Sequence, residues 1–568
     1  MALGLADDTR ATSAGGTPSR SRAWLLPLGA ALLLGVFLPL AYAALSGNLG
    51  IPHNDTWAFG RSAQEFARTG HLPMFNWNMM GLAGQVVLVW PVGASLAAQS
   101  VVVAGLAVAG LAACFDVLCG AFGPEGRRRA AVGTLVVALW PGFALLSTSF
   151  MTDVPAFAAV AGTLALGRRA LDGASGRWLA ASCAVGLWGA TVREQVLAAP
   201  AAVLAVALFR ARYRADRERG HRRPVFTVAQ VLGAGVLILA ALGVFELWRR
   251  GIPGGGAPDF TVRTVTAEFV AVALVQGLLT VALAVSPVVL AVVRPRAWGR
   301  RAWTAGAVTL GAGLLAAWDK GAFLGNYVGH DGAYSAATAS GRPLLLGNVW
   351  WAVLGWLACV SAALLVGHVV QRVGERGWGL GVRPEILLFA VVTVLGTVLE
   401  VGQGRDIYDR YLLPLAIPAL VVLLTGPLPT SRRFGAAALA SAVSAGLVVV
   451  TGATLVANAF AFDATVWRTA TRLVDSGQAD AAHVEAGLVW DGYHSPAAMA
   501  DHPDRSVGVD MFGALRYLPN HSPCFVVSPS SRAAAGWRLV SVQHYKTYGL
   551  AGDARVYVYR VEGSQGCQ

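Results

Sequence analysis

The sequence has few charged residues for its length. Only 13% of its 568 residues are Asp, Glu, Lys or Arg, whereas 55% are hydrophobic, and the mean hydropathy is +0.57. Apolar runs of about 20 residues recur along the chain, and each is long enough to cross the roughly 30 Å hydrocarbon core of a bilayer. This composition predicts an α-helical polytopic membrane protein.

Cysteine is also scarce, and recognisable metal-binding motifs are absent. Six cysteines are too few for a disulfide framework. Four lie in apolar runs and are expected to be inert core residues: Cys114, Cys119, Cys183 and Cys359. Cys524 and Cys567 lie in the polar C-terminal part, where we predict a disulfide that needs an oxidising compartment. Neither CxxC nor HExxH occurs, so we predict no metal site and no cofactor; a divalent metal has no support in the sequence.

The basic residues do not form a single patch, although the net charge is +13. The arginines stand in short clusters between apolar runs, which is how cytoplasmic loops are marked. The charge therefore predicts membrane topology, and no nucleic-acid partner is expected.

The chain divides into three parts. Residues 1–22 read as a disordered cytoplasmic tail, residues 23–457 as a transmembrane domain with a first outer loop at 46–94, and residues 458–568 as a separate α/β domain. About thirteen spans are predicted. Their apolar runs are 23–45, 95–122, 130–150, 155–168, 178–192, 196–209, 226–247, 265–293, 303–319, 346–368, 385–401, 411–427 and 435–457. The arginine clusters place the N-terminus inside the plasma membrane, and an odd number of spans places the C-terminal domain outside.

Apolar runs shorten and alternate after residue 457. The stretches GLVWDGY, CFVVSPS, WRLVSVQHY and RVYVYRV read as strands of period two, and Ala464–Asp475 reads as an amphipathic helix. A small extracytoplasmic α/β domain is expected.

Ionisable residues that are not in cytoplasmic loops gather at the outer ends of the predicted spans. A charge at mid-span costs at least about 2.5–3.5 kcal/mol, so this placement is informative. It favours chemistry at the outer surface over transport through the bilayer. The residues are Asp55, Glu65, Asp153, Arg193, Glu194, Glu268, Lys320, Glu400, Arg405, Asp406, Asp409 and Arg410.

Asp55 follows the first span directly. The segment TWAFGRSAQEFARTG predicts an interfacial amphipathic helix that stops at Gly70, with Asp55 at its N-cap. The carboxylate can cap this helix, face a cavity as a reactive group, or do both. Asp153, in FMTDVPAF, has the same two interpretations, because Pro155 in a first turn marks a helix start.

Two arginines and two aspartates precede a late span in GQGRDIYDRYLLPLAIPALVVL, residues 402–423. They could bridge one another, or the arginines could clamp a phosphate, since guanidinium groups bind phosphate oxygens bidentately. Arg193, in TVREQV, is a further candidate for such a clamp.

Together these elements resemble the GT-C superfamily of membrane glycosyltransferases. The Asp after the first span, MTDVP in a short outer loop, RYLLPLAIP at a late span and the outside C-terminal domain are most similar to family 39, which includes protein O-mannosyltransferases and bacterial aminoarabinose transferases. Family members commonly read Asp-Glu at the first motif. Here it reads Asp55-Thr56, so the second carboxylate is missing.

The resemblance implies transfer of a sugar, with inversion, from a polyprenyl-phosphate-linked donor to a hydroxyl of a glycan, protein or lipid acceptor. It implies Asp55 as the general base and Asp153 as its helper or as a residue of the acceptor site. Arg405, Arg410 and Arg193 would bind the donor phosphate, and further substrate contacts would come from His53, Trp57, Tyr408 and Tyr411. The alternatives are a flippase for lipid-linked sugars, which would need polar residues deep in the spans, and a non-catalytic scaffold.

Overall fold

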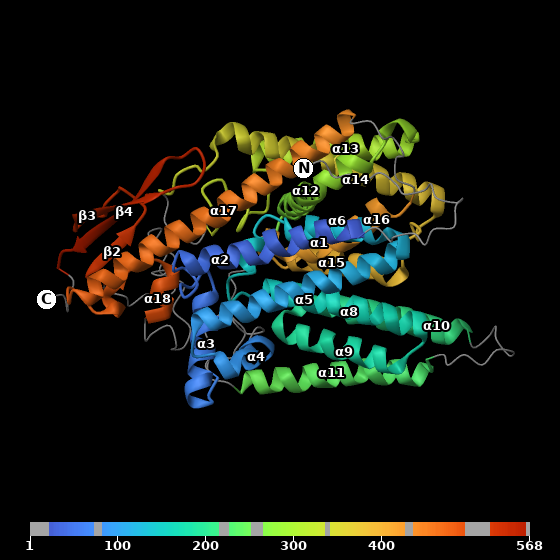
Figure 1. Ribbon diagram of the computed structural model, residues 1–568, viewed down its shortest axis with the longest axis horizontal. Coiled ribbons are helices and arrows are strands. Elements are labelled where there is room, and N and C mark those ends of the chain that lie inside the picture. Colours follow the sequence, from blue (N-terminus) through green and yellow to red (C-terminus); the bar gives the residue numbers. More distant parts are fainter. Residues whose placement is uncertain are drawn as a thin grey trace.

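Long apolar helices make up most of the structure, and a small sheet lies at one end of the molecule (Figure 1). The computed structural model describes residues 22–72, 82–214, 226–251, 265–334, 341–426, 435–494 and 523–563. The helices of the first half are α1 (Leu25–Leu32), α2 (Leu38–Leu45), α3 (Thr56–Thr69), α4 (Val87–Val89), α5 (Leu96–Phe122), α6 (Arg127–Ala138), α7 (Phe143–Leu146), α8 (Asp153–Gly173), α9 (Gly176–Val192), α10 (Ala198–Arg214) and α11 (Val228–Arg250). Those of the second half are α12 (Ala267–Val292), α13 (Arg300–Asp319), α14 (Gly347–Arg376), α15 (Pro384–Gly402), α16 (Ala416–Leu424), α17 (Ala436–Asp475) and α18 (Leu488–His494).

Eight helical segments of the described chain are long and apolar enough to cross a membrane. They are Arg22–Leu45, Leu96–Phe122, Glu194–Arg212, Val228–Arg250, Ala267–Val292, Gly347–Arg376, Pro384–Gly402 and Ala436–Asp475. The first of these is continuous because a π-helical stretch, Leu33–Phe37, joins α1 to α2. A polytopic helical membrane protein is therefore confirmed; which side each terminus faces stays a prediction.

The predicted count of about thirteen spans is not confirmed, although every predicted apolar run coincides at least in part with a helix. The run at 130–150 shows why. Helix α6 ends at Ala138, and the chain then turns through Pro141 and Gly142, whose φ is 95°. Proline cannot continue the backbone hydrogen bonding and glycine accepts a positive φ, so the apolar run breaks into α6 and the short α7.

Helix α8 is closely surrounded by small residues on its neighbours. It packs against α5 and α9. A Cβ at Gly110 of α5 would lie 3.1 Å from the Cβ of Ala158, and one at Gly189 of α9 would lie 2.3 Å from the Cβ of Ala159. Small residues at such crossings let membrane helices approach. This packing brings the start of α8 and the end of α9 together.

The long helix α17 joins the transmembrane part to the sheet (Figure 1). It packs against α12 near its start and against the sheet near its end, where Phe462, Val466 and Ala470 enter the core of the C-terminal part. The predicted domain boundary at residue 458 falls inside this continuous helix, and the predicted helix Ala464–Asp475 is its last part. The sheet is thus held by a helix, without an intervening linker.

The sheet has the strand order β1-β2-β4-β3. Its strands are β1 (Val484–Glu485), β2 (Phe525–Ser528), β3 (Trp537–Lys546) and β4 (Asp553–Val561). Strand β1 pairs with β2 in parallel, and the other pairs are antiparallel. Three of the four predicted strands are confirmed, because alternating stretches fit a sheet with one covered face.

The prediction of a strand at GLVWDGY is wrong, because these residues form α18. Gly487 turns the chain with φ 83°, and the Asp491 carboxylate accepts a hydrogen bond from the Ala486 N–H at 3.0 Å. Gly492 then lies directly against the indole of Trp57 on α3, where a Cβ would be only 2.5 Å away. A short apolar run can form either a strand or a helix, and here these contacts favour the helix.

Candidate active site

Four charged side chains from distant parts of the sequence meet in one cluster, which we call the charged cluster: Asp55, Asp153, Arg193 and Arg410. The guanidinium of Arg410 lies at its centre. Its Nη2 is 3.4 Å from Asp55 Oδ2, and its Nε is 3.6 Å from Asp153 Oδ1. Arg193 Nη2 lies 3.1 Å from the same Asp153 oxygen. Asp153 therefore stands between two guanidinium groups.

Each member is positioned by the end of a helical element. Asp55 directly precedes α3, and Asp153 is the first residue of α8. Arg193 directly follows α9 in an extended conformation, and Arg410 lies in the 3-10 helix Asp409–Leu415 that leads into α16. The N-terminus of α8 favours a negative charge on Asp153, because the helix dipole is positive there.

The carboxylates differ in exposure. The side chain of Asp153 is 1% exposed and that of Arg410 5%, whereas Arg193 is 17% and Asp55 22% exposed. Asp55 is thus the carboxylate that a substrate can reach. Asp153 holds the two arginines in place from within.

Capping does not occupy the Asp55 side chain. Asp55 stands at the N-cap of α3, and Gly70 ends this helix with φ 71°, both as predicted. The side chain makes no capping hydrogen bond, however, and Oδ2 faces Arg410 instead. Burial raises the pKa of Asp55. The charges of Arg410 and, less strongly, Arg193 lower this pKa, whereas the charge of Asp153 raises it. The net pKa of Asp55 lies above the ordinary value.

Tyrosine rings surround the two guanidinium groups. The Cζ of Arg193 lies 4.2 Å from the ring centroid of Tyr411, and that of Arg410 lies 5.4 Å from the same ring and 5.3 Å from Tyr408. Tyr327 adds a third ring at 5.7 Å from Arg410. These distances allow cation–π attraction, which fixes the arginines where they lie. Tyr408 and Tyr411, predicted as substrate contacts, therefore contact the predicted phosphate-binding residues.

Asp409 supports the cluster from behind and does not bridge to an arginine side chain. It is fully buried, and Oδ2 accepts hydrogen bonds from the N–H groups of Tyr327 at 2.8 Å and Val328 at 2.5 Å. Oδ1 accepts from the Arg410 N–H at 2.7 Å. Burial raises the pKa of Asp409 to about 7, even though these three hydrogen bonds lower it. For Asp409 and Arg410, mutual side-chain bridging is thus not what the structure shows.

Removal of the Asp409 carboxylate should destabilise the protein. Asp409→Ala leaves three backbone N–H groups without their acceptor, and each unsatisfied buried group costs about 1–3 kcal/mol. We expect a clear fall in the Tm of the purified protein in detergent. Asp406→Ala, three residues away at an exposed position, is the matched control. Equal Tm values for both variants would contradict this role of Asp409.

Sequence reasoning did not find Tyr327 or Thr152 as site residues. Arg193 donates to Thr152 Oγ1 from Nη2 at 3.0 Å and from Nε at 3.3 Å. Thr152 directly precedes Asp153 in the MTDVP stretch, so its place in the site could have been inferred from that stretch. Tyr327 lies in an irregular segment, and no sequence signal marks it.

Three predicted binding residues belong neither to the charged cluster nor to the tyrosine rings around it. His53 is buried, and its Nδ1 donates to Asp463 Oδ2 on α17. Trp57 is buried against Gly492 of α18. Arg405 lies on the exposed turn after α15. Their roles in substrate binding stay predictions.

The predicted disulfide and the prediction on metals are only partly covered by the described residues. Cys524 is buried at the start of β2 and is disulfide-bonded, whereas Cys567 lies outside the described residues, so their pairing stays a prediction. Within the described ranges no group of three or more His, Cys, Asp or Glu side chains could hold a metal ion. The prediction of no cofactor is not tested by this finding.

No family model and no curated protein matches the chain. Among solved structures it matches ArnT from Cupriavidus metallidurans bound to undecaprenyl phosphate, with 15% identity and a TM-score of 0.40 over 96% of this chain and 100% of that one. It also matches the apo oligosaccharyltransferase of Archaeoglobus fulgidus, with 14% identity and a TM-score of 0.41 over 90% and 70% of the two chains. Both are glycosyltransferases of the GT-C superfamily, which the sequence motifs resemble. With TM-scores below 0.5, this likeness carries no conclusion about the activity of the chain.

Proposed function

We propose that this membrane protein is a GT-C glycosyltransferase that moves a sugar from a polyprenyl-phosphate-linked donor to an acceptor hydroxyl outside the cell membrane. One observation carries the proposal: the reachable carboxylate of Asp55 lies beside two guanidinium groups that a buried Asp153 holds together. A base next to a pair of phosphate-binding cations is what a single displacement at a sugar phosphate needs.

In the proposed reaction the acceptor oxygen forms a bond to the anomeric carbon while its proton passes to Asp55. The bond between that carbon and the phosphate oxygen breaks, and the electron pair stays on the departing polyprenyl phosphate. Attack from the opposite face inverts the sugar centre. Arg410 and Arg193 stabilise the charge that grows on the phosphate, an effect that needs fixed cations. Asp153 and the tyrosine rings keep them fixed.

The decisive experiment separates a transferase from a flippase for the same lipid. Purified protein in lipid nanodiscs is incubated with polyprenyl-phosphate sugars and membrane extract as a source of acceptors, and free polyprenyl phosphate is measured by mass spectrometry. A transferase releases polyprenyl phosphate, whereas a flippase leaves the sugar–phosphate bond intact. No release with any tested sugar, together with no binding of polyprenyl phosphate, would refute the proposal.

The raised pKa of Asp55 gives the transfer reaction a predicted pH dependence. A base must be ionised, and burial shifts the ionisation of Asp55 to higher pH than that of an exposed aspartate. We expect the rate to fall, as pH is lowered, at a higher pH than the ordinary pKa of about 3.9 for aspartate. The check is the transfer rate as a function of pH at saturating donor. An unchanged rate down to the ordinary value would contradict the role of Asp55 as base.

A further inference from the structure

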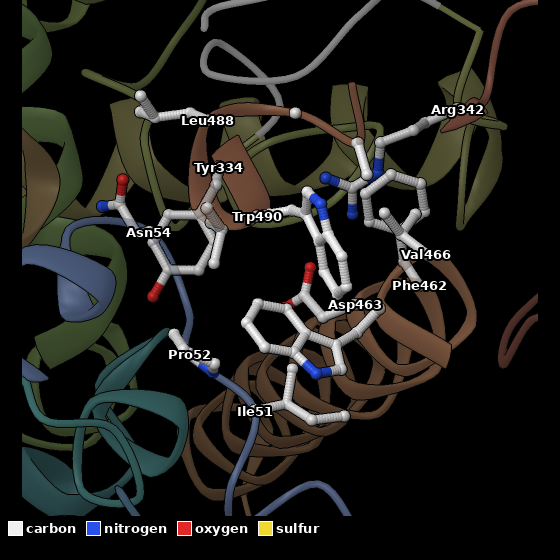
Figure 2. A pocket seen from close by; sticks show the side chains of 14 residues that line it. Ile51, Pro52, Asn54, Tyr334, Arg342, Phe462, Asp463, Val466, Leu488 and Trp490 are labelled. Carbon is white, nitrogen blue, oxygen red and sulfur yellow. The ribbon is translucent and has the colours of Figure 1, made fainter. Parts of the chain in front are cut away.

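A pocket with aromatic walls lies between the segment before α3 and the C-terminal part of α17 (Figure 2). Its walls come from the segment 51–54, from the C-terminal part of α17, from residues 486–490 at the start of α18, and from Tyr334 and Arg342. We call it the aromatic pocket and define it by six of its lining residues: Tyr334, Arg342, Phe462, Asp463, Trp467 and Trp490. None of the four residues of the charged cluster lines it.

We propose that the aromatic pocket binds the acceptor, and that the acceptor is a neutral carbohydrate whose sugar ring lies against these aromatic side chains. This inference rests on the proposed function and names the class of its acceptor.

Closely packed aromatic rings form much of the walls. The rings of Trp467 and Trp490 meet edge to face, with centroids 4.9 Å apart and an interplanar angle of 72°. Phe462 is covered by the guanidinium of Arg342, whose Cζ lies 4.5 Å from the ring centroid. A sugar ring has C–H groups on its faces, so rigid aromatic rings can bury it at low entropic cost.

Polar groups in the same walls suit hydroxyl groups. The Asp463 carboxylate lies among the rings of Tyr334 and Trp490 (Figure 2); it accepts from His53, and 18% of its side chain stays exposed. Asn54, which also lines the pocket, is 6% exposed, and its Nδ2 has no hydrogen-bond partner among the described residues. A hydroxyl both donates and accepts, so one sugar can serve donors and acceptors together.

The same polar groups disfavour other occupants. A hydrocarbon tail would leave Asn54 Nδ2 without a partner and would remove water from the exposed part of the Asp463 carboxylate, and both effects cost free energy. Arg342 and Asp463 both line the pocket, so a cationic or an anionic side chain would be attracted by one of them and repelled by the other, with little net gain. Because these two residues carry opposite charges, a neutral polar ligand fits best.

The pocket also has the right position for an acceptor. Asn54 lines it, and Asp55, the proposed base, is the next residue in the chain. Tyr334, which lies beside Asn54 (Figure 2), donates from its hydroxyl to the Tyr327 hydroxyl, and the Tyr327 ring lies 5.7 Å from the Cζ of Arg410. The aromatic pocket and the charged cluster are thus connected through the Asn54–Asp55 peptide and through the Tyr334–Tyr327 hydrogen bond, which is why we place the acceptor there.

The test measures binding of simple probes by saturation-transfer NMR to the full-length protein in nanodiscs. The probes are the methyl glycosides of glucose, mannose and galactose, and the methylamide of N-acetyl-lysine as a cationic peptide probe. We expect saturable binding of at least one glycoside, weakened roughly tenfold by Trp467→Leu and less by Trp467→Phe, which keeps a ring. Trp537→Leu, at a tryptophan that packs on Tyr559 in the sheet, should bind as wild type does.

Every outcome either supports or contradicts the carbohydrate pocket. Binding of no glycoside, equal binding by Trp467→Leu, or binding of the lysine probe alone would overturn the carbohydrate pocket. Binding of polyprenyl phosphate is measured on the same samples and should be unchanged by Trp467→Leu. If polyprenyl phosphate binds while the glycosides do not, only the pocket proposal fails; if polyprenyl phosphate does not bind and no donor is cleaved, the proposed function itself fails.

Discussion

Replacement of Asp55 by asparagine is expected to abolish sugar transfer while the Tm stays nearly unchanged. Asparagine has the same shape and can still accept a hydrogen bond from Arg410, which also keeps Asp153 as a partner. It cannot take up the proton of the acceptor hydroxyl. Loss of a general base typically lowers a rate about 10²- to 10⁴-fold. The measurement is polyprenyl phosphate release under saturating donor, with Tm determined on the same preparation.

A carboxylate on the same helix provides the matched control. Glu65 of α3 is partly exposed and pairs with Arg68 at 2.6 Å, away from the charged cluster. Glu65→Gln removes one negative charge from α3 but should keep wild-type turnover. Wild-type turnover by Asp55→Asn would refute the base. A large loss of Tm in Asp55→Asn would instead show that the charge of Asp55 stabilises the fold.

Local sequence signals predicted the elements that carry the site. A proline in the first turn marked the start of α8, and a glycine with a left-handed conformation marked the end of α3. These signals act within a few residues, so a single chain contains them. For the same reason Asp55, Asp153 and Arg410 were expected at the ends of helices, where the structure has them.

The contacts between these elements could not be predicted in the same way. Asp55 and Arg410 are separated by 355 residues, and their pairing depends on how the helices pack. The two interpretations of Asp55 stayed open for this reason, since only the packed structure shows which partner its side chain takes. Asp409 is a further example. Bridging to its charged neighbours was one of two interpretations of the sequence, but the folded chain brings Asp409 against the N–H groups of Tyr327 and Val328.

Short apolar stretches also limit how well secondary structure can be predicted from the sequence. The strands β3 and β4, with ten and nine residues, were predicted from their alternation. The seven residues of α18 fit a strand equally well in sequence, and contacts with Trp57 and Ala486 decided for a helix. Membrane spans have the same ambiguity, because the run at 130–150 contains no charged residue but is interrupted by Pro141 and Gly142.

Removal of the Arg410 side-chain charge should affect both stability and transfer. Arg410→Gln leaves Asp153, which is almost fully buried, with Arg193 alone, and it leaves Asp55 without its partner. Breaking a buried ion pair in this way costs about 3–5 kcal/mol. Loss of a fixed group that stabilises transition-state charge typically costs about 10²- to 10³-fold in rate. We therefore expect a lowered Tm and a strongly reduced release of polyprenyl phosphate. Arg68→Gln, at an exposed arginine, serves as control.

A second substitution separates these two effects. Asp153→Asn in the Arg410→Gln background removes a buried negative charge that has lost one of its two arginine partners, so part of the lost Tm should return. Transfer should not return, because the cation that faces the departing phosphate is still missing. If the stability losses of the two single variants simply add, then Asp153 and Arg410 are not coupled as their 3.6 Å contact implies. If the double variant recovers wild-type transfer, Arg410 does not stabilise the phosphate, and Arg193 must do so alone.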